Sequence, residues 1–130
     1  FGDGRWPQEA RRFGPVRLAL IPIGAFRFEP GMVRTASHIG PMEAERVFAQ
    51  LKAGFAIPIH WGTFQLSNEA RETPPKMLAE VVRCAGYADA SRFAAHPVGT
   101  AVDVPALGKI PDQHAPNAEC LARSDIYRLN

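Results

Sequence analysis

Two nearly continuous apolar runs constrain the fold of this chain more than any other feature. Residues 16–24 read VRLALIPIG, and residues 55–62 read FAIPIHWG. Each run has the length of a β-strand, and a strand with so few polar positions is typical of a sheet covered on both faces. Between them, residues 41–52 place apolar side chains at the i, i+3, i+4 and i+7 spacing of an amphipathic helix. Strand, helix and strand in this order predict an α/β unit.

Further elements are predicted on both sides of this unit. Pro7 can open a short helix through Phe13, because its missing N–H would be unpaired in a first turn anyway. Residues 74–85 show a second amphipathic helix pattern, and residues 91–104 read as a last strand or a pair of short strands. Residues 105–130 have no clear period. We therefore expect a domain over residues 1–104, followed by a carboxyl-terminal tail or docking arm.

Composition excludes several classes of protein. The 130 residues are 46% hydrophobic and 22% charged, which is typical of one globular domain or of part of one. The 15 Lys and Arg residues are dispersed among 13 Asp and Glu, so nucleic acid is not an expected partner. No apolar run approaches the ~20 residues that span a bilayer. Cys84 and Cys120 form no Cys-x-x-Cys pair, which argues against a disulfide and favours a reducing, cytoplasmic compartment.

Among the four histidines, His60 is the most informative because it ends the second apolar run just before Gly62. Since glycine lets the backbone turn sharply, we expect this imidazole to emerge at the carboxyl edge of the sheet, where α/β enzymes keep their chemistry. Such an imidazole is frequently a metal ligand or a general base, but a core histidine satisfied by backbone groups fits the spacing equally well. Taken alone, His38 is typical of a surface or capping residue, and we expect His96 and His114 to be solvated.

Three carboxylates could carry charge or chemistry beside the histidines. Asp3 lies between two glycines, where a carboxylate can coordinate a cation, although the same GDG triplet is typical of an Asx-turn. Glu43 and Glu45 fall near the start of the predicted helix over residues 41–52, and we interpret them as charges that complement the helix dipole. Composition and spacing thus predict an α/β unit with a candidate Asp/His site at the strand ends, and they name no reaction.

A family resemblance takes the interpretation further. In order, the segments GDGRW, RFGPVRLALIPIGAF, HIGPMEAERVFAQLKA and IHWGTFQLSNEARETPPKMLAEVV resemble the second half of the metallo-β-lactamase fold. The branch they resemble is that of N-acyl-phosphatidylethanolamine-hydrolysing phospholipase D and its bacterial relatives, and ascorbate-6-phosphate lactonase-like proteins are a more distant comparison. The resemblance covers residues 1 to about 104. It implies an αββα sandwich, of which this chain would supply one sheet with flanking helices.

The resemblance also implies a reaction and its site. In this family two metal ions, usually zinc, lie at one edge of the paired sheets. Asp3 matches the aspartate that bridges the metals, and His60 matches the last histidine ligand. His38 matches a histidine beside the metals that can contact the substrate's phosphate or leaving group. The implied function is hydrolysis of a phosphodiester, such as an N-acyl-phosphatidylethanolamine-like phospholipid, by attack of metal-bound hydroxide, with a membrane-peripheral location as one consequence.

Some of the family's motifs are missing from this sequence. The usual GDTGY or GDSGY reads GDGRW, and no H-x-H-x-D-H motif, which supplies the other ligands, occurs. Because the chain also begins with Phe rather than Met, we expect a fragment that is inactive alone and leaves one sheet face bare. The amino-terminal half of the domain would supply the second sheet and most ligands. Two alternatives stay open: a catalytically inactive half-domain that acts as a binding or interaction module, and a lactonase of the same fold.

Overall fold

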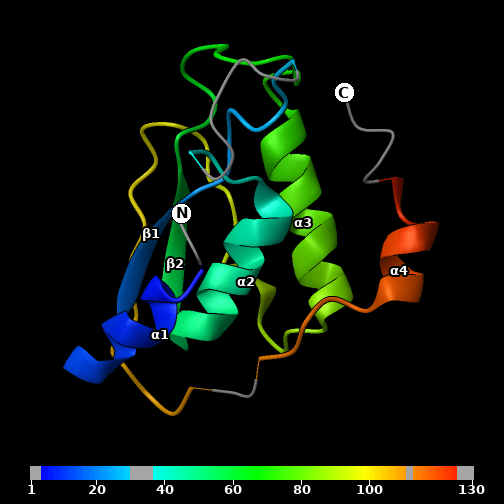
Figure 1. Cartoon of the computed structure of the whole chain (residues 1–130). Helices are drawn as coiled ribbons and strands as arrows, with labels where there is room; N and C mark the ends of the chain where they lie inside the picture. Colours follow the sequence, from blue (N-terminus) through cyan, green and yellow to red (C-terminus); the bar gives the residue numbers. More distant parts are fainter. Residues whose placement is uncertain (1–3, 30–36, 111–112, 126–130) are drawn as a thin grey trace.

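A parallel pair of strands organises the part of the chain that the structure, a computed structural model, describes: residues 4–29, 37–110 and 113–125. β1 (Leu18–Pro22) and β2 (Phe55–Ile59) lie side by side, with Leu18 opposite Phe55 and Pro22 opposite Ile59. Parallel neighbours need a crossover connection, and this one contains α2 (Pro41–Leu51). The predicted α/β unit is therefore confirmed (Figure 1).

Helices cover one face of the strand pair. α2 and α3 (Thr73–Ala85) lie side by side against it, and the short helix α1 (Trp6–Ala10) packs near α2 (Figure 1). A 3-10 turn, η1 (Arg11–Phe13), continues α1, so the predicted helix from Pro7 to Phe13 is confirmed. The core under these helices centres on Phe48, whose ring centroid lies 5.0 Å from that of Phe93 and 5.8 Å from that of Tyr87.

The opposite face of the strand pair is largely uncovered. Leu18, Leu20 and Ile59 are 38%, 59% and 40% exposed. The prediction that the first strand is buried on both faces is therefore wrong for this chain, because the helices of the described residues pack against the other face only. The expectation of a bare sheet face, which followed from the resemblance, agrees with these exposures.

The start of α2 separates the two glutamates that sequence analysis treated alike. Glu43 lies in the first turn, as predicted, and its carboxylate also accepts a hydrogen bond from the backbone N–H of Gly40 at 3.2 Å. Glu45 is instead fully buried, and the Tyr87 hydroxyl donates to its Oε1. Burial raises the pKa of Glu45, although the Tyr87 hydrogen bond opposes the shift. The interpretation of Glu45 as a first-turn charge that complements the helix dipole is wrong, because Glu45 lies beyond the first turn and faces the core.

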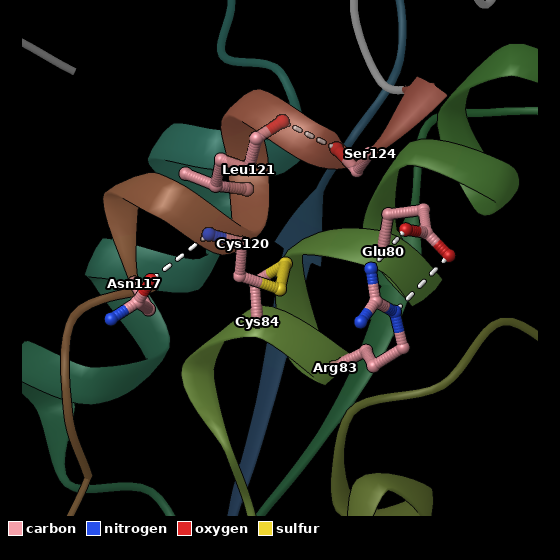
Figure 2. The surroundings of a disulfide bond; sticks show 7 residues. All are labelled: Glu80, Arg83, Cys84, Asn117, Cys120, Leu121 and Ser124. Atoms are coloured by element: carbon pink, nitrogen blue, oxygen red, sulfur yellow. Dashed lines mark hydrogen bonds and ion pairs between the residues drawn. A yellow bond between two sulfur atoms is a disulfide. The ribbon is translucent and has the colours of Figure 1, made fainter.

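A disulfide joins the last helix to α3, contrary to the expectation of unpaired cysteines. Cys84 of α3 and Cys120 of α4 (Ala118–Arg123) are bonded, with their Cα atoms 5.5 Å apart (Figure 2). Asn117 brings the chain back to α3: its backbone N–H donates to the Cys84 carbonyl at 2.8 Å, and its side chain caps α4 by accepting from the Cys120 N–H at 2.9 Å. The cysteine spacing could not reveal this pair, because the two residues meet only in the tertiary structure.

The segment after α3 departs from prediction. Instead of a strand over residues 91–104, the structure has a 3-10 turn, η2 (Ala90–Arg92), and a single parallel bridge between Phe93 and Ala56 of β2. Pro97 and Gly99 then turn the chain, since the Thr100 N–H donates to the Pro97 carbonyl at 3.1 Å and Gly99 has a φ of 88°. No helix in the described ranges is long and apolar enough to cross a membrane.

Candidate functional site

The carboxyl ends of β1 and β2 meet at one edge, where both chains bend sharply. Beyond the strand proper, the Ile23 N–H still donates to the Ile59 carbonyl at 3.0 Å. Then Ala25 and His60 both adopt left-handed backbone conformations, with φ of 56° and 63°. Residues other than glycine rarely adopt this conformation, and it concentrates at functional sites. The edge is therefore a strained part of the backbone.

Two glycines make this bend possible. A Cβ atom on Gly24 would lie 2.2 Å from the carbonyl oxygen of His60, so no side chain fits between the two backbones. Gly62 is buried and has a φ of 76°, which confirms the turn predicted after His60. Gly24 thus sets how closely the His60 backbone approaches the end of β1.

The structure brings two of the three predicted site residues together. The ring centroids of His38 and His60 are 5.4 Å apart, with the rings nearly perpendicular at 76°. His38 is half-buried and also contacts Phe28, at 5.1 Å between ring centroids. His60 is exposed, so the alternative of a core histidine is wrong. Asp3 lies outside the described residues.

Glu69 ties together the loops that follow the two strands, a role that sequence analysis missed. Its carboxylate, 6% exposed, accepts hydrogen bonds from the backbone N–H groups of Ala25 at 2.7 Å and Arg27 at 3.0 Å, and from the Ser67 hydroxyl. Burial alone would raise the pKa of Glu69, but the hydrogen bonds from Ser67 and the backbone outweigh it and hold the pKa below its ordinary value. No local signal marks this residue, because its backbone partners lie 42 and 44 residues earlier.

Hollows open on the His60 side of the edge. One, of about 250 Å³, is lined by the 60–66 loop together with Glu69 and Arg71. An adjoining one, of about 300 Å³, is lined by Phe64 and Leu66, which are 79% and 57% exposed. His60 therefore lines two adjoining hollows, of which the first is also lined by Arg71 and both are lined by Phe64 and Leu66.

The donor set decides how a metal could be held here. Imidazole nitrogens suit zinc, and a catalytic zinc site takes about three protein ligands. Within the described ranges, no group of three or more His, Cys, Asp or Glu side chains comes together in a way that could hold a metal ion. His60 and His38 thus have the chemistry of members of a metal site, but the described residues do not complete one.

Comparisons with known proteins agree with the resemblance. Residues 2–61 match the family model described as "Beta-lactamase superfamily domain". Over 76 residues, 58% of this chain, the sequence is 36% identical to N-acyl-phosphatidylethanolamine-hydrolyzing phospholipase D 1 of Caenorhabditis elegans, covering 21% of that protein. Over 79 residues, 60% of this chain, it is 34% identical to the mitochondrial N-acyl-phosphatidylethanolamine-hydrolyzing phospholipase D of Saccharomyces cerevisiae, covering 16%.

A bacterial relative has no assigned activity. An uncharacterized protein of Mycobacterium tuberculosis is 34% identical over 68 residues, which are 50% of this chain and 17% of that protein. The chain thus spans about a fifth of the length of the curated relatives it matches. The family match runs across β1, α2 and β2 to the residue after His60. The α/β fold and these matches confirm the resemblance to metallo-β-lactamase-fold hydrolases and, among them, to the branch of N-acyl-phosphatidylethanolamine-hydrolysing phospholipase D.

Proposed function

We propose that these residues form the carboxyl-terminal part of the catalytic domain of a metal-dependent hydrolase that cleaves the phosphodiester of a phospholipid. The observation that carries this proposal is the contact between the imidazoles of His38 and His60, which lie at the carboxyl edge of a parallel strand pair. Polar groups that converge at this edge are typical of α/β active sites. The substrate class comes from the relatives, which are named for hydrolysis of N-acyl-phosphatidylethanolamine.

In this proposal each residue has a separate role. Asp3 and His60 would hold zinc, with further ligands from residues outside this chain. When bound, the metal would supply Lewis-acid chemistry to the phosphoryl oxygens. A ring nitrogen of His38 would donate a hydrogen bond to a phosphoryl or leaving-group oxygen. Because Gly24 and Gly62 already fix the turn around His60, its imidazole would need little rearrangement to coordinate zinc.

The surroundings of His60 support an amphiphilic substrate. Phe64 and Leu66 give the adjoining hollow an exposed apolar rim, which suits acyl carbons. Arg71 lines the hollow of about 250 Å³, where a guanidinium would attract a phosphate. One site thus offers both kinds of contact that a phospholipid needs.

The experiment compares two histidine variants in a longer protein that carries these residues and the H-x-H-x-D-H motif. His60→Ala is expected to lower zinc content and to reduce turnover of an N-acyl-phosphatidylethanolamine by about 100-fold or more, since even residues that only support a ligand are worth 10–100-fold. His38→Ala should keep the zinc and lose turnover. His114→Ala, an exposed histidine after α3, is the matched control. Unchanged zinc content and turnover in His60→Ala would reject the proposal.

The bare sheet face supports a second candidate from a different class. Leu18, Leu20 and Ile59 give this face an exposed apolar surface, which could serve a binding or interaction module without catalysis. The coding sequence upstream of Phe1 separates the two candidates. An H-x-H-x-D-H motif in the same reading frame supports the hydrolase, whereas a start codon directly before Phe1 supports the module.

A further inference from the structure

The carboxylate of Glu69 connects the two loops that carry the histidines. Its Oε1 accepts from the N–H groups of Ala25 at 2.7 Å and Phe26 at 3.4 Å, and its Oε2 accepts from the N–H of Arg27 at 3.0 Å and from the Ser67 hydroxyl. Three consecutive N–H groups of the loop after β1 thus converge on one buried carboxylate from the loop after β2. Hydrogen bonds to an ionised acceptor are about twice as strong as neutral ones, so this junction is a strong one.

On one side, the junction sets the position of His60. Ala25 follows Gly24, whose backbone lies against the His60 carbonyl. Ala25 has a left-handed backbone with a φ of 56°, a conformation that its own side chain disfavours. The hydrogen bond from its N–H to Glu69 holds it there, and so holds the end of β1 against the turn at His60.

On the other side, the junction sets the position of His38. The Arg27 carbonyl accepts from the N–H of Asn68 at 2.7 Å, and the Asn68 side chain donates to a carboxylate oxygen of Glu29 at 2.9 Å. Phe28 lies between these two anchored residues, and its ring contacts the ring of His38. Glu69 and its neighbour therefore fix the aromatic surface against which His38 rests.

We propose that Glu69 is a positioning residue that sets the approach of the His38 and His60 imidazoles through the loop after β1. The effect of Glu69 on catalysis rests on the proposed function, but its effect on the approach of the two imidazoles does not. A purely structural glutamate would contribute to overall stability and leave the relation between the two rings unchanged in folded molecules. The two roles can therefore be told apart by measuring ring proximity and overall stability in the same variant.

The test uses Glu69→Gln, which keeps the shape but turns an N–H donor toward the Arg27 N–H. Loss of the charge-assisted hydrogen bonds is expected to speed amide hydrogen exchange at Ala25 and Arg27 by about 10- to 100-fold. The nuclear Overhauser effect between the ring protons of His38 and His60 should weaken. Exchange at Leu78 in the core should change by less than about twofold, because local opening does not require global unfolding.

Two further variants keep the test decisive. Glu72→Gln changes an exposed glutamate three residues away and should leave exchange at Ala25 and the ring contact unaltered. Should Glu69→Gln fail to fold, Ser67→Ala removes a single donor to the carboxylate and should still speed exchange at Ala25 by a few-fold. Wild-type exchange and an unchanged ring contact in folded Glu69→Gln would overturn the proposal. A loosened loop in a protein without hydrolase activity would overturn only the proposed function.

Discussion

Replacing both cysteines by serine is predicted to release α4 before the rest of the chain unfolds. Cys84 and Cys120 are 36 residues apart. In the chain-entropy model, cross-linking a loop of this length stabilises the folded state by about 4 kcal/mol. α4 has six residues and is too short to be stable as an isolated helix. The disulfide is therefore expected to provide about half of the free energy that holds α4 against α3.

Two other contacts of α4 together contribute a free energy comparable with that of the disulfide. Burial of the Leu121 side chain contributes about 1.5–3 kcal/mol, and the hydrogen bond from the Asn117 N–H to the Cys84 carbonyl about 0.5–1.5 kcal/mol. Ordering the backbone of six residues costs roughly 6–12 kcal/mol at about 1–2 kcal/mol each. With the disulfide, the stabilising contributions come close to the entropic cost of ordering α4. Without the disulfide, the entropic cost is larger than the stabilisation. α4 should then detach.

Amide exchange and urea unfolding together test this reasoning. In Cys84→Ser/Cys120→Ser, the amides of Leu121 and Ser124 should lose their protection, while the amides of β2 keep theirs. The free energy of unfolding from urea should fall by no more than about 4 kcal/mol. A reducing agent should reproduce both effects in the wild type and add nothing in the variant. Protected Leu121 and Ser124 amides in the reduced protein would refute the reasoning.

Two other substitutions test the buried acid and the strand edge. Burial raises the pKa of Glu45 above its ordinary 4.5, so its contribution to stability is full below that value and is lost as pH rises through the raised pKa. Glu45→Gln should therefore show a smaller fall in urea midpoint between about pH 5 and about pH 8 than the wild type, and an equal fall would contradict this. Gly24→Ala places a Cβ 2.2 Å from the His60 carbonyl oxygen and should cost about 1–3 kcal/mol of unfolding free energy. Its control, Gly108→Ala, meets no atom within 4 Å and should stay within about 0.5 kcal/mol of the wild type, so equal losses in both would argue against the steric cause.

The helices were predictable because their evidence is local. The apolar stripe over residues 41–52 became α2 (Pro41–Leu51), and the stripe over residues 74–85 became α3 (Thr73–Ala85). The strands were found with longer bounds than they have, since an apolar run continues past the last paired residue. β1 ends at Pro22, although apolar residues continue to the edge beyond it.

What the sequence could not reveal depends on partners distant along the chain. Glu45, Glu69 and Cys84 are defined by Tyr87, the Ala25 N–H and Cys120, each at least 36 residues away. Nothing in the local pattern around a glutamate distinguishes a solvated carboxylate from one that accepts three backbone N–H groups. Burial on both faces of β1 was wrongly predicted for the same reason, because coverage depends on what packs against the sheet.

The two histidines of the candidate site were only partly predictable from the sequence. Parallel strands bring their carboxyl ends to one edge, so the position of His60 followed from the pattern alone. His38 taken alone was typical of a surface or capping residue, and the family resemblance gave it a place beside the metals. The structure shows its ring in contact with the ring of His60.

Neither the sequence pattern nor the family resemblance predicted the left-handed backbone conformation of His60. A left-handed conformation costs a residue with a side chain about 1–2 kcal/mol, and glycine would adopt it without that cost. The imidazole is also exposed, so it contributes little to the core. A histidine at this position therefore works against the stability of its own turn, and strain of this kind favours a role in chemistry over a role in folding.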